Sequence, residues 1–453
     1  MTFVQNDVSY YGFWLWCLFG DGAADERCAT ALAGPGIMTE YPLPAVWFLE
    51  VLYTLGSGAP PWLPWAILGG LTVAAYAALS LWRSRPHLAK LVVGATLGSA
   101  ILLWFCAALP MRSTAFATWL PVFALTMLLL DATVTFLLFR HGTISATLFW
   151  IVFIGACGPI VWFRFDILTA AAVAIACLWL IRYPFASGAL IGIGASVKLW
   201  PALLIAPMAA PNPRASGNKR LIGFLVTGLS LGLASLLIGG WARSVSPIEW
   251  QSHRGLQMES VPATPLLFLR AFTHEGAWEV KLSEYNAIEL FGPGASTLLT
   301  VSTLLTAGSL VLTGLLTWRL FKNRNAPDQQ TEAILLVVLA VVLATIIANK
   351  TLSTQYVQWL AGPFAALLAL APSKAMRRAR RVLTVGLVIV AVLTQYTYPW
   401  GTHGIMALPY ASGFETSTLI VRNILLVLLM GFTSGLAWRA SATGNQTSSE
   451  EVR

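Results

Sequence analysis

Long apolar runs separated by short polar segments make up most of the chain after residue 61. A helix needs about 20 mostly apolar residues to cross the hydrocarbon core of a bilayer. The sequence contains about eleven such runs, at residues 62–82, 88–109, 114–139, 143–163, 166–182, 221–241, 294–319, 332–349, 354–371, 382–398 and 417–438. The pattern therefore predicts an all-α polytopic membrane protein.

The segment 1–61 has a different pattern. An aromatic stretch at residues 10–19 is followed by an apolar stretch at 43–55, which contains Glu50. At about 13 residues the second stretch is too short to span a bilayer, and it is typical of a helix that lies in the interface. We expect an outer loop with juxtamembrane helices here. We also expect a membrane span upstream of Asp7, because no signal peptide or span precedes it to carry this loop across the membrane.

The stretch 184–210 is too short for two spans, although the loops on both sides of it are expected on one side of the membrane. Its closely spaced glycines and Lys198 predict a hairpin of two short helices that is broken near the lysine. Irregular backbone at membrane depth is tolerated where protein buries it or water reaches it, so we expect this hairpin to form a wall of a cavity. The alternative is one tilted helix beside a misassigned neighbour.

The composition narrows the class of protein further. Charged residues make up 10% of the chain, whereas a soluble domain has about 25%. The net charge of +9 does not indicate nucleic-acid binding, because Lys and Arg concentrate in short loops that the positive-inside rule places in the cytoplasm. The transmembrane domain covers residues 62–440, and the polar tail 441–453 is expected to be cytoplasmic and disordered. The segments left for the outer side are 1–61, 164–166, 242–293, 350–354 and 399–416.

The five cysteines show no metal-binding spacing. Cys106, Cys157 and Cys177 lie in apolar runs and are expected to pack as small hydrophobic residues. Cys17 and Cys28 share the first outer segment, where a disulfide can form if that segment faces an oxidising compartment. Paired and free thiols both remain open at this point.

The outer segments contain basic side chains suited to an anionic ligand. His253 and Arg254 are adjacent in the largest outer segment, and arginine offers a planar fork that matches phosphate. Lys350 lies near Gln355 at a helix boundary, and Lys198 lies in the broken hairpin, where an ionisable residue is a functional candidate. The alternatives are a solvated loop around His253 and a lysine at position 350 that snorkels to the interface.

Arg164 and Asp166 lie two residues apart between two predicted spans. One interpretation is that they neutralise each other and hold a turn. The other is that Arg164 joins the remaining outer cations in binding an anion. The sequence leaves both open.

The carboxylates of the outer side are few and scattered. Asp7 is followed by Tyr10 and Tyr11, and Glu40 by Tyr41. No carboxylates have metal-ligand or paired-acid spacing, and serine elbows, phosphate-binding loops and zinc motifs are absent from the sequence. No cofactor is predicted, and metal dependence stays open, although a single carboxylate argues against a tightly held ion.

One general base with several cations fits the transfer of a sugar from a lipid phosphate. The carboxylate takes the proton of the acceptor hydroxyl. The cations stabilise the negative charge that grows on the departing phosphate.

Motifs along nearly the whole chain carry a resemblance to a known family. In order they are Asp7-Val-Ser-Tyr-Tyr11, Glu40-Tyr-Pro42, Arg164-Phe-Asp166, Lys198-Leu-Trp-Pro201, His253-Arg254-Gly-Leu-Gln-Met-Glu-Ser260 and Lys350-Thr-Leu-Ser-Thr-Gln-Tyr356. Together they resemble glycosyltransferase family 87, the actinobacterial integral-membrane mannosyltransferases of the type C superfamily. Tyr41-Pro42-Leu43 departs from the Tyr-Pro-Pro that is frequent in that family.

The resemblance implies a type C glycosyltransferase fold in the cell membrane, with the active site facing the periplasm. It implies inverting transfer of mannose from polyprenyl-phosphate-mannose to a mannosylated phosphatidylinositol or lipomannan acceptor. The product is an α-1,2 linkage in cell-envelope and lipoarabinomannan biosynthesis, and Asp7 is the expected general base. Residues expected to contact the donor phosphate or sugar are His253, Arg254, Lys350, Gln355, Arg164 and Lys198. Residues expected on the acceptor side or as a reserve base are Glu40, Tyr10, Tyr41 and Glu259.

Two other classes of protein are compatible with the sequence. A transporter or flippase of lipid-linked sugars also needs a cationic cavity, but transporters often contain inverted repeats, and the halves of this chain show no such symmetry. A non-catalytic scaffold for envelope assembly is the third interpretation. Transfer of sugar by the purified protein without a membrane gradient separates the enzyme from both.

Overall fold

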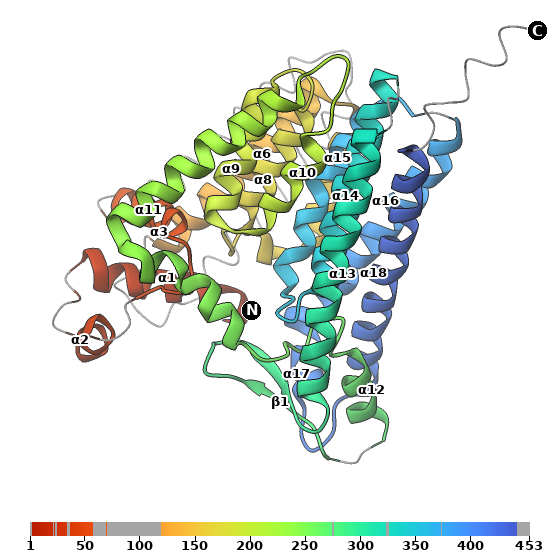
Figure 1. The fold of residues 1–453 in the computed structure, drawn as a ribbon. Helices are drawn as coiled ribbons and strands as arrows, with labels where there is room; N and C mark the ends of the chain where they lie inside the picture. Colours follow the sequence, from red (N-terminus) through yellow and green to blue (C-terminus); the bar gives the residue numbers. More distant parts are fainter. Residues whose placement is uncertain are drawn as a thin grey trace, which may run out of the picture.

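The protein is built largely of helices, as predicted (Figure 1). In a computed structural model, the described residues are 2–20, 22, 25–33, 37–57, 69, 119–273, 276–322, 326–372 and 374–441. Apart from residue 69, the predicted spans 62–82 and 88–109 lie outside these residues.

Six helices in the described part of the chain are long and apolar enough to cross a membrane. They are α6 (Trp119–His141), α11 (Gly217–His253), α13 (Ala295–Lys322), α14 (Pro327–Ala348), α16 (Lys374–Gln395) with its continuation η6 (Tyr396–Trp400), and α18 (Gly413–Ala440). Helix α14 packs between α13 and α18 and is almost entirely buried. Helices α11 and α13 leave most of their apolar side chains exposed, as expected of helices in contact with lipid. The chain is therefore a multi-pass membrane protein.

Three predicted spans are short helices instead. Residues 143–163 contain α7 (Ile144–Cys157) and η3 (Pro159–Val161), and residues 166–182 contain α8 (Asp166–Leu178). Residues 354–371 form a 3-10 segment, η5 (Thr354–Leu360), and a short helix, α15 (Ala361–Ala369). Most residues between these short helices are apolar and are buried by other parts of the protein. Phe163, for example, is fully buried. Hydropathy does not distinguish burial in protein from burial in lipid, so these predicted lengths were wrong.

The prediction of a broken hairpin is confirmed, because the Arg220 guanidinium donates to the carbonyls of both Leu180 and Ala210 and so holds the two ends of the stretch together. Helix α9 (Pro184–Val197) ends at Lys198, whose backbone is extended, and the chain continues through η4 (Trp200–Leu204) into α10 (Ile205–Met208). Helix α9 packs against α11 so closely that a Cβ on Gly188 would lie 1.8 Å from the Arg220 carbonyl oxygen. Small residues permit this approach of two backbones. The alternative of one tilted helix is wrong.

The segments predicted for the outer side meet one another at one end of the bundle: residues 264–291 and 402–406 lie in the lower part of Figure 1, and the N-terminal helices lie on its left. Four contacts tie them together: Asp7 with Arg164, Ser246 with the Thr39 carbonyl, Lys350 with the Ser252 carbonyl, and Arg270 with the Ile405 carbonyl. The prediction that these segments share one side is confirmed by these contacts.

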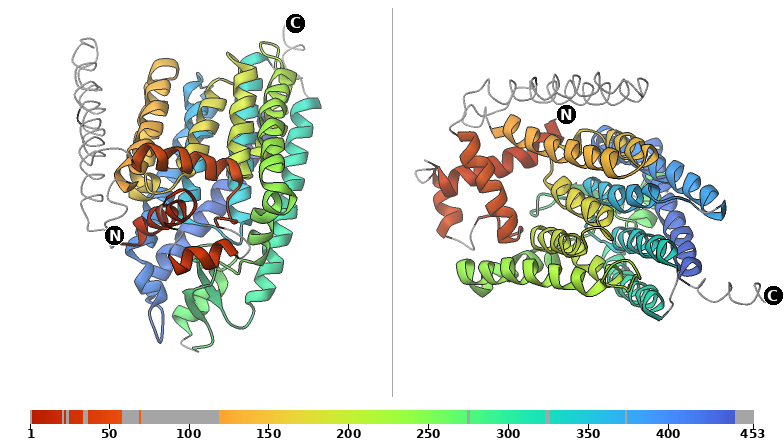
Figure 2. Two further views of the ribbon diagram at one scale, coloured as in Figure 1. Left: turned by 90° about the vertical axis from the view of Figure 1, so that its left-hand side faces the viewer. Right: turned by 90° about the horizontal axis from the view of Figure 1, so that it is seen from above.

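Three helices at the N-terminus flank this end of the bundle (Figure 2). They are α1 (Thr2–Phe19), α2 (Glu26–Ala33) and α3 (Leu43–Ser57). Asp7 therefore lies in a helix and not in a loop. A disulfide joins Cys17 at the end of α1 to Cys28 in α2, which decides between the two states that the sequence left open.

A small β-hairpin and two short helices complete the same end. The hairpin pairs β1 (Glu279–Leu282) with β2 (Ile288–Phe291) in antiparallel register, and the short helices are α12 (Thr264–Phe272) and α17 (Thr402–Met406). Strand β2 is also hydrogen-bonded to residues 256–258, through Met258 N to the Ile288 carbonyl (3.0 Å) and Leu290 N to the Leu256 carbonyl (2.8 Å). The all-α prediction missed this hairpin.

Candidate active site

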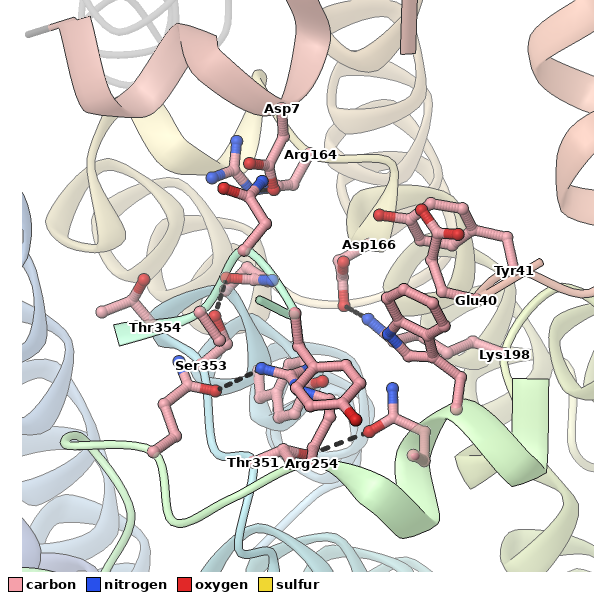
Figure 3. Close-up of a pocket in the computed structure, with 18 of the residues that line it drawn as sticks. Asp7, Glu40, Tyr41, Arg164, Asp166, Lys198, Arg254, Thr351, Ser353 and Thr354 are labelled. Carbon is pink, nitrogen blue, oxygen red and sulfur yellow. Dashed lines mark hydrogen bonds and ion pairs between the residues drawn. The ribbon is translucent and has the colours of Figure 1, made fainter. Parts of the chain in front are cut away.

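A cavity of about 730 Å³ lies at this end of the bundle (Figure 3). Its walls come from α1, the segment before α3, the turn into α8, the break after α9, the end of α11, the β-hairpin and η5. The predicted site residues that line it are Asp7, Tyr10, Glu40, Tyr41, Arg164, Lys198, Arg254, Glu259 and Gln355. Residues from distant parts of the sequence thus share one polar cavity.

The end of α11 reaches the cavity because the helix kinks. Gly240 has φ 72°, a left-handed conformation that glycine adopts without the steric cost that a side chain imposes. Beyond the kink, Pro247, Trp250 and Gln251 line the cavity. The kink therefore directs the last turns of α11, which precede Arg254, along the wall of the cavity.

Asp7 and Arg164 form an ion pair, with Asp7 Oδ2 2.7 Å from Arg164 Nε. The Arg164 side chain is 6% exposed, whereas 28% of the Asp7 side chain is exposed. Helix α1 is held in place by Trp119, whose Nε1 donates to the Val8 carbonyl at 2.7 Å. The carboxylate is therefore fixed on its buried side and accessible from the cavity.

Asp166 pairs with Lys198 and not with Arg164. The Lys198 Nζ lies 2.7 Å from Asp166 Oδ1, and Trp359 Nε1 donates to the same oxygen at 3.1 Å. The prediction of an Arg164–Asp166 pair is wrong because the two side chains, on either side of the start of α8, meet partners from different elements. Asp166 itself lines the cavity, which the sequence reasoning missed.

Arg254 makes fewer hydrogen bonds than Arg164, the other arginine that lines the cavity. Its NH2 donates to Gln257 Oε1 at 3.1 Å, and its Nε lies 3.9 Å from Glu289 Oε1 without a hydrogen-bond partner. Figure 3 shows Arg254 with Thr351 and Ser353 on the side of the cavity away from Asp7. Part of its guanidinium is therefore free to bind an anion between the two sides.

Lys350 and His253 do not line the cavity. The Lys350 Nζ donates to the carbonyls of Ser252 (2.9 Å) and Arg254 (2.7 Å), at the C-terminal end of α11. Burial and the nearby Arg254 lower the pKa of Lys350. Lysine often binds carbonyls that a helix end leaves unpaired, so Lys350 holds the turn that carries Arg254. His253 is exposed. Direct contact of either residue with the donor is therefore not supported.

Glu40 accepts a hydrogen bond from the Tyr10 hydroxyl at 2.5 Å. Burial raises the pKa of Glu40, although the bond from Tyr10 opposes the shift. Tyr41 follows on the same wall and packs edge-on against Phe165, with ring centroids 5.3 Å apart. This wall offers carboxylate and phenol groups to hydroxyls of a ligand.

Glu259 is a buried carboxyl at the back of the cavity. Its Oε2 accepts a hydrogen bond from Gln257 at 3.3 Å, and its Oε1 has no partner. Burial raises the pKa of Glu259 to about 7, against the opposing effect of Arg422. The side chain is therefore uncharged in a large share of molecules at neutral pH.

Replacing Glu259 by glutamine is expected to change how stability depends on pH. An unfolded glutamate titrates near pH 4.5 and the folded Glu259 near 7, so the folded state holds an extra proton between these values. Stability therefore falls as the pH rises through this window, by on the order of 3 kcal/mol in all. The variant lacks this loss, so its melting temperature relative to the native protein should rise from pH 4.5 to pH 8 in detergent.

The control for this measurement is Glu249→Gln. Glu249 is exposed on α11, so this variant should follow the native protein at every pH. Equal pH dependence of the native protein and Glu259→Gln would contradict the assignment.

An aromatic stack beside Lys198 was also missed. Trp200 and Trp359 stack with centroids 4.5 Å apart, and Tyr356 stacks on Trp359 at 4.2 Å. The Lys198 Nζ lies 4.5 Å from the Tyr356 ring centroid. The signal was present in two of the motifs, each of which contains or adjoins an aromatic residue of the stack.

The fold and the cavity define a class of protein: a multi-pass membrane protein with a polar cavity of carboxylates and cations at one end of its helices. The sequence profile of glycosyltransferase family 87 matches residues 96–347, which is more than half of the chain. The chain therefore belongs to this family and is a glycosyltransferase. The matched region contains Arg164, Lys198, Arg254 and Glu259, whereas Asp7 lies before it. No curated protein and no solved structure matches the chain.

Proposed function

We propose that the protein transfers mannose, with inversion, from polyprenyl-phosphate-mannose to a mannosylated phosphatidylinositol or lipomannan acceptor, forming an α-1,2 linkage. The observation that carries the proposal is the arrangement of Asp7 and Arg254 on different sides of one cavity (Figure 3). The transfer requires an accessible carboxylate at the acceptor hydroxyl and an incompletely paired guanidinium at the departing phosphate, and these two residues supply them. Family membership favours this enzyme over a transporter or a scaffold.

Asp7 is the proposed general base. Its Oδ2 is engaged by Arg164, and we assign Oδ1 to the proton of the acceptor hydroxyl. As the hydroxyl oxygen forms its bond to the anomeric carbon of mannose, its proton passes to Asp7. Attack on the face opposite the phosphate converts the β-linked donor into an α-linked product.

Arg254 is the proposed ligand of the departing phosphate. When the bond between the anomeric carbon and the phosphate oxygen breaks, the electron pair stays with the phosphate, whose charge grows from one negative to two. A fixed cation at this position stabilises the transition state more than the bound donor. Lys198, whose ammonium gives one of its three donors to Asp166, offers further donors to phosphate or sugar.

The same proposal places the cavity on the periplasmic side. The Cys17–Cys28 disulfide is typical of segments that face an oxidising compartment. Basic residues of the positive-inside pattern lie at the other ends of the helices: Arg214 precedes α11, and Arg377 is in the first turn of α16. Both features favour an outer location for the cavity.

A transfer assay in detergent tests the proposed function. Purified protein receives polyprenyl-phosphate-mannose with either a mannosylated phosphatidylinositol or lipomannan, in the absence of a membrane gradient. We expect mass spectrometry to show an acceptor heavier by one hexose, with an α-1,2 linkage by nuclear magnetic resonance. The acceptor that is elongated identifies the substrate.

Reconstituted vesicles provide the opposing outcome. Movement of the donor lipid between leaflets, without elongation of either acceptor, would contradict the proposal and support a flippase. Elongation with a donor other than the mannosyl lipid would retain the enzyme class and overturn the sugar specificity.

A further inference from the structure

Arg164 makes more hydrogen bonds than Lys198 or Arg254, the other two cations that line the cavity. Its NH1 donates to the Val4 carbonyl at 2.9 Å and to the Phe163 carbonyl at 3.0 Å, and its Nε faces Asp7 Oδ2 at 2.7 Å. The Tyr398 hydroxyl is a further hydrogen-bond partner. A guanidinium has five N–H donors, so little of this one is left for a ligand.

Two of these contacts reach α1. Val4 and Asp7 lie three residues apart in this helix, which places them on the same face. One buried guanidinium therefore binds both the backbone of the helix and the carboxylate that it carries. Removing the partner of a buried charge strongly destabilises the folded protein. The loss of either Arg164 or Asp7 is therefore expected to disturb the other.

Arg254 has fewer and longer contacts than Arg164. It donates one hydrogen bond, to Gln257, and its nearest carboxylate oxygen is 3.9 Å away, compared with 2.7 Å for Arg164. The sequence alone gave both arginines the same expected role. Their contacts in the structure indicate two different roles.

We infer that Arg164 is a positioning residue, which fixes α1 and orients the Asp7 carboxylate, and that it does not bind the donor phosphate. The inference rests on the proposed function, in which Asp7 is the base. It assigns binding of the phosphate to Arg254. Arg164 then acts on the proton transfer, through the position of Asp7.

Arg164→Gln is the first test variant. Its expected effect is a fall in kcat of about tenfold or more, with binding of polyprenyl phosphate changed by less than about twofold. The KM of the donor should stay near its native value, because Arg254 and Lys198 are unchanged. Loss of a purely structural residue would lower the fraction of folded protein and leave the kcat of that fraction unchanged.

Arg164→Lys is the second variant, and it keeps the test decisive if the glutamine variant does not fold. The lysine retains the charge but loses the fork that contacts Val4 and Asp7 together. Its kcat should then lie between that of the native protein and that of Arg164→Gln, and the KM of the donor should again stay near its native value. Binding of polyprenyl phosphate, measured by native mass spectrometry, should remain native.

Matched arginine variants complete the experiment. Arg254→Gln should weaken polyprenyl phosphate binding, and Arg214→Gln should change nothing, because Arg214 pairs with Asp328 in an exposed position at the other end of the bundle. A loss of binding in an Arg164 variant as large as that in Arg254→Gln would overturn the inference. Native activity of Asp7→Asn would overturn the proposed base instead, so the two failures are distinguishable.

Discussion

Replacement of Asp7 by asparagine is expected to reduce the rate of glycosyl transfer by about 10²- to 10⁴-fold, the usual contribution of a general base. Asparagine keeps the shape of the side chain but cannot take a proton from the acceptor. The measurement is kcat at saturating donor and acceptor. Binding of polyprenyl phosphate should persist, because Arg254 and Lys198 are unchanged.

The same substitution leaves Arg164 without its carboxylate, so a loss of stability must be separated from a loss of chemistry. The melting temperature of the variant in detergent measures the first, and bound polyprenyl phosphate shows that the cavity is intact. Asp25→Asn is the matched control, since Asp25 pairs with Arg27 at the start of α2 and lies outside the residues that line the cavity. This control should retain native activity.

Two other carboxyls would replace Asp7 if the variant transferred mannose at the native rate. Glu40→Gln and Glu259→Gln then identify which of them is the base. A base with the raised pKa of Glu259, about 7, would lose activity as the pH falls through neutrality. Activity that persists well below pH 7 would exclude Glu259 and leave Glu40.

The long helices could be predicted from the sequence because hydropathy and length are enough to recognise them. Helices α13, α14 and α18 coincide with predicted spans to within a few residues at most ends. The short helices around the cavity could not be predicted in this way. Their apolar residues are buried by other helices, and the chain turns back before it has crossed a bilayer.

The membership of the site was largely predictable, but the partners of its charges were not. Topology placed Asp7, Arg164 and Arg254 on one side, which was sufficient to bring them together. Pairing depends on side-chain direction, which sequence spacing does not give: Arg164 reaches α1, and Lys350 binds carbonyls at the end of α11. A lysine bound to backbone and a lysine free for phosphate look the same in a sequence.

Replacement of Arg254 by glutamine is the second large effect that we expect. Hydrogen bonds to charged groups contribute about 1.5–3 kcal/mol each, so binding of polyprenyl phosphate, the dianionic product, should weaken by about 10- to 100-fold. The donor has one negative charge on its phosphate, and its KM should rise less. Because the extra charge appears during the reaction, kcat should fall as well.

Arg254→Lys sharpens this expectation. Lysine keeps the positive charge but cannot form the planar, two-pronged contact with phosphate, so its binding of polyprenyl phosphate should lie between the native protein and the glutamine variant. Titrations at low and high salt separate charge from geometry, since screening weakens exposed charge interactions more. Native polyprenyl phosphate affinity in Arg254→Gln would show that another cation of the cavity, with Lys198 first, holds the phosphate.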